Sequence, residues 1–355
     1  MTYLVEIEPL GETIEVEDGQ TILSAALRAG IYLPHACGHG LCSTCKVDVL
    51  EGEVEIGPAS PFALMDIERD EGKCLTCCAT PKSDLVIEAD IEEDEDAEKR
   101  PVKDFDVVVT KIETLTPRIK AIFLANESNR MEFQAGQYIN VEVPGLEGQP
   151  RAFSIASAPT ESKFLELNVS RVDGGEGTGW IHDTLQVGDT VSFSGPYGRF
   201  FTRKSRKDSL LFLAGGSGLS SPKSMILDLL ENDNDTREIT LIYGARNQDE
   251  LYYRELFESL EKRHQNFRYI ATLSDEPEDS GWQGHRGFVH EIANTVFEGK
   301  FEGLTAYLCG PPPMIDACVT ALMRGRCFER SIFMENFYTN ANKDDKPKSP
   351  LFKAI

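Results

Sequence analysis

Residues 34–46 read Pro-His-Ala-Cys-Gly-His-Gly-Leu-Cys-Ser-Thr-Cys-Lys. Three cysteines in this stretch, Cys37, Cys42 and Cys45, have the C-x4-C-x2-C spacing that surrounds a [2Fe–2S] cluster. Two glycines between the first two cysteines let the backbone turn tightly, so that its N–H groups can donate to sulfur atoms. The stretch therefore predicts a cluster-binding loop that needs a fourth thiolate from elsewhere in the chain.

The next cysteines are Cys74, Cys77 and Cys78, and spacing alone does not choose among them. A zinc site is the alternative, because Cys42/Cys45 and Cys74/Cys77 form two C-x2-C pairs. These pairs are farther apart than in a usual zinc ribbon, and they leave Cys37 without a role. The spacing therefore favours the iron–sulfur cluster.

The sequence on both sides of the loop predicts a small mixed fold. Residues 3–7 and 13–17 alternate apolar and polar side chains, which is typical of a β-hairpin. Residues 21–29 place apolar side chains on one helical face and end at a glycine. Short strands are expected at 46–50 and 84–89. A hairpin, a helix, a cysteine loop and a returning strand together predict a β-grasp ferredoxin fold.

The segment 74–81, Cys-Leu-Thr-Cys-Cys-Ala-Thr-Pro, resembles the Leu-Thr-Cys-x-Ala-x-Pro segment of plant-type ferredoxins. In that family this segment supplies the last ligand of the cluster. The resemblance implies that Cys77 is the fourth ligand, beside Cys37, Cys42 and Cys45.

Charge and composition restrict the class of protein. The net charge is −23, and residues 1–100 carry −16 of it, which argues against a nucleic acid or an anionic membrane as a partner. No apolar run approaches the ~18 residues of a membrane span, and no secretory signal is visible. Nine cysteines without a disulfide-like pattern fit a reducing compartment, so we expect a cytoplasmic protein.

Beyond residue 90 the sequence predicts a linker and a β-barrel. Residues 91–102 are charged and poor in apolar side chains, and six short strand-like runs separated by Gly and Pro follow. The barrel segment contains Arg-Ala-Phe-Ser at 151–154 and Gly-Gly-Glu-Gly-Thr-Gly at 174–179, followed by a helical stretch at 180–185. A fixed cation and free N–H donors at a helix N-terminus are what a pyrophosphate needs.

The hydrophobic pattern changes at Leu210, where buried strands begin to alternate with helices. A strand at 210–214 leads into Gly-Gly-Ser-Gly-Leu-Ser-Ser-Pro at 215–222 and a helix at 223–231. A second helix is expected at 248–264. A last strand at 305–308 leads into Cys-Gly-Pro-Pro-Pro-Met at 309–314. This alternation predicts a Rossmann-like parallel α/β domain with a phosphate-binding glycine turn.

These ordered motifs resemble those of the ferredoxin–NAD(P)⁺ reductase family, although this chain has Phe153 where Tyr is commoner. The resemblance implies a flavin site in which Arg151 holds the FAD pyrophosphate with Gly177 and Thr178, Phe153 packs on the isoalloxazine and Ser154 lies near N5. It also implies a nicotinamide site made by Gly215, Gly216, Ser217, Gly218, Cys309 and Gly310, with Ser154 and Cys309 as the catalytic residues. The aromatic segment 333–338 would bring Phe337 to the flavin.

The whole chain, apart from linker and tail, resembles the reductase components of soluble di-iron monooxygenases, in particular those of multicomponent phenol hydroxylases. The resemblance implies electron flow from NADH through FAD and the cluster to a separate di-iron hydroxylase. The reductases of Rieske dioxygenases and of deoxysugar dehydrases share this domain order and remain alternatives. A redox-sensing or zinc-binding interaction protein is an alternative of another class.

The expected organisation has five parts: a ferredoxin domain (1–90), an acidic linker (91–102), an FAD-binding barrel (103–205), an NAD-binding domain (206–338) and a polar tail (339–355). NADH is favoured over NADPH because Asp249 and Glu250, after the second strand of the last domain, would repel a 2′-phosphate. Arg246 nearby could instead attract one.

Overall fold

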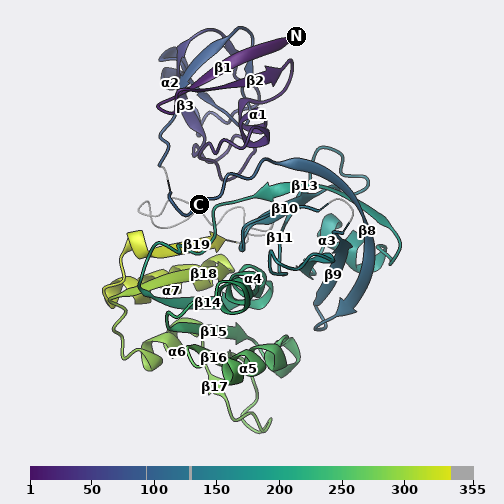
Figure 1. Ribbon diagram of the computed structural model, residues 1–355, viewed down its shortest axis with the longest axis vertical. Helices are drawn as coiled ribbons and strands as arrows, with labels where there is room; N and C mark the ends of the chain where they lie inside the picture. Colours follow the sequence, from purple (N-terminus) through teal and green to yellow (C-terminus); the bar gives the residue numbers. More distant parts are fainter. Residues whose placement is uncertain (93, 128–129, 337–355) are drawn as a thin grey trace. The chain divides into compact units, whose positions relative to one another are not determined.

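The computed structural model describes residues 1–92, 94–127 and 130–336 (Figure 1). The chain divides into two compact units, residues 1–103 and 104–354, and each is described by itself. None of the helices in the described ranges has both the length and the apolar character needed to cross a membrane. Phe337 and the tail 339–355 lie outside the described residues.

The first unit is a five-stranded mixed sheet in the order β2-β1-β7-β3-β5, with a separate β4-β6 pair. Its elements are β1 (Thr2–Glu8), β2 (Glu12–Glu17), α1 (Ile22–Arg28), β3 (Lys46–Glu51), β4 (Val54–Glu55), α2 (Asp66–Asp70), β5 (Lys73–Leu75), β6 (Thr80–Pro81) and β7 (Leu85–Glu88). The hairpin strands β1 and β2 are antiparallel, and β7 returns parallel to β1. This is the predicted β-grasp fold.

Helix α1 covers this sheet because its apolar face is buried in one core with both hairpin strands and β7. Thr21 caps the helix, accepting a hydrogen bond from the Ser24 N–H at 3.3 Å. The end of the predicted linker packs on the same helix: the Val102 N–H donates to the Leu27 carbonyl at 3.0 Å, and Val102 is buried. The predicted linker, residues 91–102, is thus part of the first unit, and its end packs on α1.

The second unit begins with the predicted antiparallel barrel. Its elements are β8 (Lys103–Thr114), β9 (Ile119–Ala125), β10 (Tyr138–Val141), β11 (Arg151–Ser154), β12 (Phe164–Ser170), α3 (Glu176–Asp183) and β13 (Thr190–Tyr197). The six strands follow the order β11-β10-β13-β8-β9-β12. A bridge between Ile155 and Leu167 joins the two outer strands, so the sheet almost closes on itself around an apolar interior.

A six-stranded parallel sheet in the order β17-β16-β15-β14-β18-β19 completes the second unit. Its strands are β14 (Ser209–Gly215), β15 (Ile239–Ala245), β16 (Phe267–Leu273), β17 (His285–Arg286), β18 (Leu304–Gly310) and β19 (Ile332–Asn336). Its helices are α4 (Ser220–Leu227), α5 (Arg254–Arg263), α6 (Val289–Val296) and α7 (Pro312–Arg324), with short 3-10 or π turns at Gly216–Leu219, Asp228–Asn232, Gln248–Glu250 and Glu329–Ser331.

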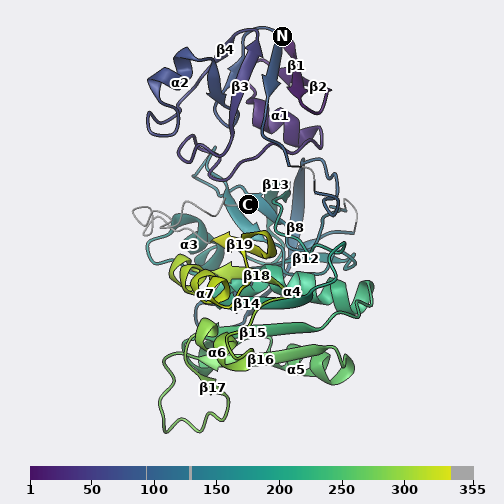
Figure 2. The same cartoon turned by 90° about the vertical axis from the view of Figure 1, so that its left-hand side faces the viewer.

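Helices cover both faces of this sheet, as the Rossmann-like prediction requires (Figure 2). One apolar core joins the sheet to α4 and α5, and a second core joins the opposite face to α6 and α7. The strand order reverses between β14 and β18, which is the position where open α/β sheets bind ligands beyond the carboxyl ends of their strands. The fold therefore places the glycine turn after β14 beside the Cys309 motif after β18.

Three expected helices differ from those observed. The helix expected at 223–231 is α4, which begins at Ser220, followed by the π turn Asp228–Asn232. The helix expected at 248–264 is a 3-10 turn, Gln248–Glu250, followed by α5, which begins at Arg254. Between them Tyr253 takes a left-handed conformation, with φ 57°, which interrupts the helix. The helix expected at 180–185 is α3, which begins at Glu176, so part of the glycine-rich stretch forms its first turn.

Candidate functional site

The cysteine loop connects α1 to β3 without regular structure, and one glycine in it is required by close packing. A Cβ on Gly40 would lie 2.7 Å from Cys78 Sγ and 3.1 Å from Ala59 Cα, and its φ is +72°. A side-chain anchor also holds the loop, because Ser43 Oγ donates to the Ala63 carbonyl at 2.8 Å. The loop is therefore folded closely onto residues 59–63, at the surface of the unit.

The four cysteines predicted to bind the cluster lie as two pairs. A hydrogen bond links the Cys37 and Cys42 side chains, and another links Cys45 and Cys77. Accepting from the Cys37 thiol lowers the pKa of Cys42 to about 4, and the same contact raises the pKa of Cys37. The Cys37–Cys42 pair therefore readily forms one thiolate, the form that binds metal.

Backbone N–H groups point at the sulfur atoms of the first pair. Those of His39 and Leu41 lie 3.4 and 3.3 Å from Cys37 Sγ, and that of Cys37 lies 3.4 Å from Cys42 Sγ. Such donors stabilise thiolates and the sulfur atoms of a cluster. This donor set fits a [2Fe–2S] group.

The paired arrangement also bears on the zinc alternative. Two irons bridged by two sulfides need two thiolates each, whereas one structural zinc ion needs four ligands around a single point. Two thiol pairs match the first requirement. Within the described part of the chain, no three His, Cys, Asp or Glu side chains gather as ligands for one ion.

The structure distinguishes Cys77 from the cysteines on either side of it. Cys74 is fully buried in the apolar core of the ferredoxin unit. Cys78 is buried against Gly40, with its sulfur 3.6 Å from that of Cys77. Only Cys77 of these three is hydrogen-bonded to Cys45, an arrangement that favours Cys77 as the fourth ligand.

The predicted flavin residues gather where β11 meets α3. A Cβ on Gly177 would lie 2.8 Å from Arg151 Cγ, so the Arg151 side chain passes directly over the first turn of the helix. The Arg151 guanidinium donates to the Gln149 carbonyl at 2.6 Å, which holds it at the edge of the barrel. A cation and a helix N-terminus thus lie together, as a pyrophosphate requires.

Two other predicted flavin residues also lie in this part of the barrel. Thr178 Oγ1 accepts from the Val172 N–H at 3.1 Å, so the hydroxyl supports the turn itself. Phe153 is partly buried and packs against the barrel core. One side of the Phe153 ring is therefore in contact with the barrel core.

The predicted nicotinamide residues form one closely packed group. A Cβ on Gly218 would lie 2.3 Å from the Cys309 carbonyl oxygen, and one on Gly215 would lie 2.6 Å from Met314 Sδ. The two motifs, separated by about ninety residues in the sequence, are therefore in contact, because β14 and β18 are neighbours in register. Glycines are needed here for close approach, and Gly216 also has a φ of +55°.

The barrel and the parallel sheet meet at one carboxyl group, that of Glu335 in β19. This is one of several contacts between the two parts: Glu335 Oε2 accepts from Ser154 Oγ at 3.1 Å and from Ser221 Oγ at 2.8 Å, and lies 3.6 Å from Cys309 Sγ. The structure thus unites Ser154 and Cys309, which the sequence singled out, with Ser221 and Glu335, which it did not. Glu335 follows directly after the apolar run 332–334, and an acidic residue at this place is the signal that could have identified it.

Burial raises the pKa of Glu335, and the hydrogen bonds from the two serines oppose this rise only in part. Burial also raises the pKa of Cys309, with the nearby Glu335 as a second cause, so the thiol stays protonated and donates. The Glu335 carboxyl is therefore surrounded by neutral donors, and its raised pKa favours its protonated form.

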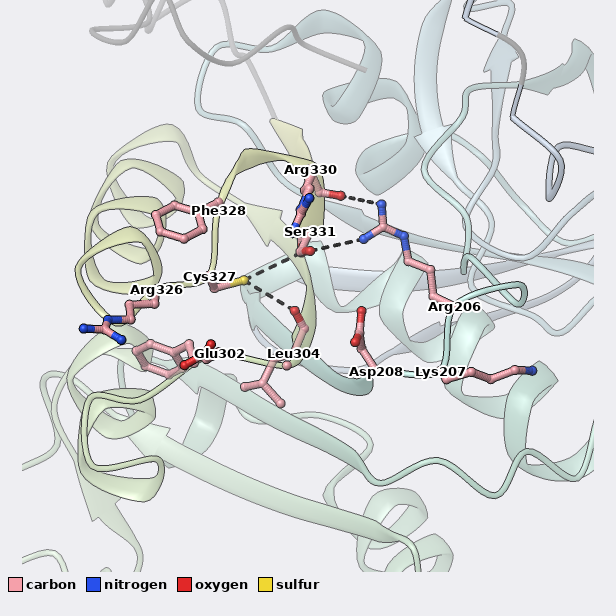
Figure 3. A pocket seen from close by; sticks show the side chains of 12 residues that line it. Arg206, Lys207, Asp208, Glu302, Leu304, Arg326, Cys327, Phe328, Arg330 and Ser331 are labelled. Atoms are coloured by element: carbon pink, nitrogen blue, oxygen red, sulfur yellow. Dashed lines mark hydrogen bonds between the residues drawn. The ribbon is translucent and has the colours of Figure 1, made fainter.

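A separate cavity lies at the opposite edge of the parallel sheet, near the first residues of β14 and β18 (Figure 3). It has a volume of about 500 Å³, and Arg206 lies in its wall, donating to Ser331 Oγ and to the Arg330 carbonyl. Its lining, as far as the described residues define it, includes none of the predicted site residues.

Comparisons with known proteins match all three parts of the chain. A 2Fe-2S iron-sulfur cluster binding domain matches residues 5–82, an oxidoreductase FAD-binding domain matches 106–202, and an oxidoreductase NAD-binding domain matches 212–320. The predicted fold class and the three predicted cofactors, [2Fe–2S], FAD and NAD(H), are thereby confirmed.

Two curated relatives match over the full length of both chains. The reductase component DmpP of phenol 2-monooxygenase from Pseudomonas sp. (strain CF600) is 59% identical over 356 residues, covering 100% of each chain. The phenol hydroxylase P5 protein of Acinetobacter pittii (strain PHEA-2) is 54% identical over 356 residues, with the same coverage. Among solved structures, the Amycolatopsis reductase GcoB is 33% identical with a TM-score of 0.84, over 95% of this chain and 99% of its own.

Proposed function

The chain belongs to the family of monooxygenase reductase components, and we propose that it carries electrons from NADH to the di-iron hydroxylase of a phenol-type monooxygenase. The observation that carries this proposal is the 59% identity, without a missing domain, to a phenol 2-monooxygenase reductase component. We also propose the limits of the five parts: the ferredoxin domain (1–90), the linker (91–102), the FAD-binding barrel (103–205), the NAD-binding domain (206–338) and the tail (339–355).

FAD accepts the two electrons of a hydride together and a [2Fe–2S] cluster accepts one at a time, so this pair divides each two-electron delivery into single-electron steps. Cys37, Cys42, Cys45 and Cys77 would hold the cluster. Arg151, Gly177 and Thr178 would hold the FAD pyrophosphate, and Phe153 would pack on its ring. Gly215, Gly216, Ser217 and Gly218 would hold the NADH phosphates, with Cys309 and Gly310 beside the nicotinamide.

The Glu335 group supports this assignment because it lies where the flavin part meets the nicotinamide part. Its Oε2 accepts from Ser154 and Ser221 and lies beside the Cys309 thiol, so contacts from three segments fix the orientation of this carboxyl. The three donors are held in fixed directions without a net charge at neutral pH. Such preorganised polar groups orient a ligand without having to reorganise during the reaction.

The surroundings of the cysteine loop support transfer to a separate protein. Cys42 is exposed, and the apolar side chains of Leu41 and Phe62 are 64% and 96% exposed. Exposed apolar side chains beside a redox site are typical of a surface that contacts a partner. The nine free cysteines favour a reducing compartment, so we place the protein in the cytoplasm.

NADH is the proposed electron donor rather than NADPH. Arg246, which directly follows β15, is held by Glu250 in an ion pair, and the Gln248 N–H donates to Glu276 at 2.9 Å. Two carboxylates therefore stand where a 2′-phosphate would arrive.

We expect kcat/KM for ferricyanide reduction to be at least about tenfold higher with NADH than with NADPH. Glu250→Gln should narrow this difference in kcat/KM by releasing Arg246. A higher kcat/KM with NADPH in the native chain would contradict the assignment.

The partner is tested by capture and spectroscopy. The tagged full chain would be used to isolate binding proteins from its host grown on an aromatic carbon source, with the same host grown on a non-aromatic source as the control. The captured oxygenase would then be analysed for iron, labile sulfide and EPR signals, and for NADH-dependent hydroxylation that requires this chain.

Iron without labile sulfide, and a mixed-valence EPR signal on partial reduction, would support the di-iron hydroxylase. Iron with labile sulfide and a Rieske-type signal would instead identify a dioxygenase reductase. Binding of a partner without any NADH oxidation would instead favour a redox-sensing protein.

A further inference from the structure

Two buried charged side chains join the barrel to the parallel sheet. Glu166 in β12 is 5% exposed and Lys223 in α4 is 4% exposed, and Lys223 Nζ lies 2.6 Å from Glu166 Oε2. A buried ion pair adds little net stability compared with apolar residues, but it is strongly directional, and removing one partner leaves an uncompensated charge. A role in fixing the geometry of this junction therefore explains the pair better than a contribution to stability does.

Both charged groups have several hydrogen-bonding partners. Besides Glu166, the Lys223 ammonium donates to the Ala156 carbonyl at 3.1 Å, and it lies 4.4 Å from the centre of the Tyr253 ring. The second carboxylate oxygen, Glu166 Oε1, accepts from the Tyr253 hydroxyl at 2.6 Å. The three side chains thus form a closed cluster that spans the two parts of the unit, and we call it the Lys223 cluster.

The Lys223 cluster is connected to the glycine turn at 215–218. Tyr252, next to Tyr253, donates from its hydroxyl to the Gly216 carbonyl at 3.0 Å. The left-handed backbone of Tyr253 lets two successive tyrosines serve the barrel and the turn. One residue after Lys223, Ser224 Oγ donates to the Ser157 carbonyl of the barrel at 2.6 Å. The turn is therefore held to the barrel through α4, which follows it, and through Tyr252 and Tyr253, which precede α5.

We propose that Lys223, Glu166 and Tyr253 are positioning residues that fix the glycine turn against the flavin barrel and so set the approach of nicotinamide to flavin. This inference rests on the proposed function, because it assigns the turn to NADH and the barrel to FAD. Misplacement of reacting groups by about 1 Å can lower a rate by about a hundredfold. The cluster should therefore control the rate of hydride transfer more than the affinity for NADH.

Tyr253→Phe and Glu166→Gln test this role in the full, flavin-loaded chain. Tyr253→Phe removes a single oxygen and keeps the ring over Lys223. Tyr269→Phe is the matched control, because the buried Tyr269 hydroxyl has no hydrogen-bond partner among the described residues. Stopped-flow absorbance would give the limiting rate of flavin reduction and the apparent Kd of NADH. Hydrogen–deuterium exchange of segments 156–166 and 216–224 would report on the junction without any turnover.

We expect the limiting rate to fall by about tenfold or more in both variants, with the Kd of NADH changed less than about threefold and with faster exchange in both segments. Tyr269→Phe should match the native chain in all three measurements. Native rates and native exchange in Tyr253→Phe and Glu166→Gln would overturn the inference, as would a lowered melting temperature with an unchanged limiting rate. Failure of NADH to reduce the flavin of the native chain would instead contradict the proposed function, and the exchange data would still test the junction.

Discussion

Glu335 shows how much a single buried carboxyl can organise. It brings together hydroxyl and thiol donors from three separate segments, and in its own strand it follows three apolar residues. Its contacts with Ser221 and Ser154 join residues 114 and 181 positions apart. No local pattern encodes such contacts, which is why sequence reasoning found Ser154 and Cys309 by resemblance but not the residue that joins them.

The raised pKa of Glu335 has a consequence for stability. As pH rises past the unfolded-state value, the unfolded chain releases this proton while the folded chain keeps it, so the free energy of unfolding falls until the folded-state pKa is passed. We expect native protein to lose stability relative to Glu335→Gln as the pH rises above about 4.5.

Urea unfolding followed by tryptophan fluorescence measures this effect, because Trp180 and Trp282 both lie in the second unit. Glu278→Gln, at an exposed position, is the control and should follow the native chain at every pH. A constant difference between the native chain and Glu335→Gln across this pH range would mean that the carboxyl does not titrate as described.

Cys77 is the residue on which the cluster assignment depends most. Cys77→Ser removes the partner of Cys45, so we expect loss of the [2Fe–2S] EPR signal and of labile sulfide. NADH-dependent ferricyanide reduction through FAD should stay within about twofold of the native rate, because the flavin site lies in the other unit. Cys78→Ser is the matched control and should keep its cluster. A native EPR signal in Cys77→Ser would assign the fourth ligand to another cysteine.

Among the elements, the first turn of α3 offers a clear test of the flavin site. Gly177→Ala forces a Cβ to within 2.8 Å of Arg151 Cγ, so the cation must move. We expect the Kd of FAD to rise about tenfold, or ~1.4 kcal/mol. Gly179→Ala, two residues later in the same helix, meets no atom within 4 Å and should keep the native affinity, with a gain of up to ~1 kcal/mol in stability. Fluorescence of released FAD and a thermal melt give both values, and equal affinities in the two variants would remove Arg151 from the site.

The elements themselves follow closely from local sequence. Period-two strands at 3–7 and 13–17 and the capped helix at 22–28 were predictable because each depends on neighbouring residues. The prediction of a helix at 248–264 was wrong for residues 248–253, because α5 begins at Arg254. In this part of the chain Tyr252 and Tyr253 are held by distant partners, Gly216 and Glu166. Tertiary contacts overrode the local preference there.

At the scale of the whole molecule, the cluster motif and the flavin and nicotinamide motifs lie in separate compact units. The cysteine loop belongs to residues 1–103, and both the flavin and the nicotinamide motifs belong to residues 104–354. The first hundred residues carry −16 of the net charge of −23, which would steer the ferredoxin unit toward a basic surface. Motif order along the sequence predicted this division, whereas no pattern in the sequence indicated the Lys223 cluster.

The most direct test of the electron relay is an anaerobic titration of the full chain with NADH, followed by absorbance and EPR. We predict that the chain takes up about three electron equivalents, two in FAD and one in the cluster, and that the EPR signal of a reduced [2Fe–2S] cluster appears. Cys77→Ser should take up about two. The contradicting result would be a native chain that takes up only about two electron equivalents from NADH. In that case the flavin would bleach, and the cluster would stay oxidised until dithionite is added.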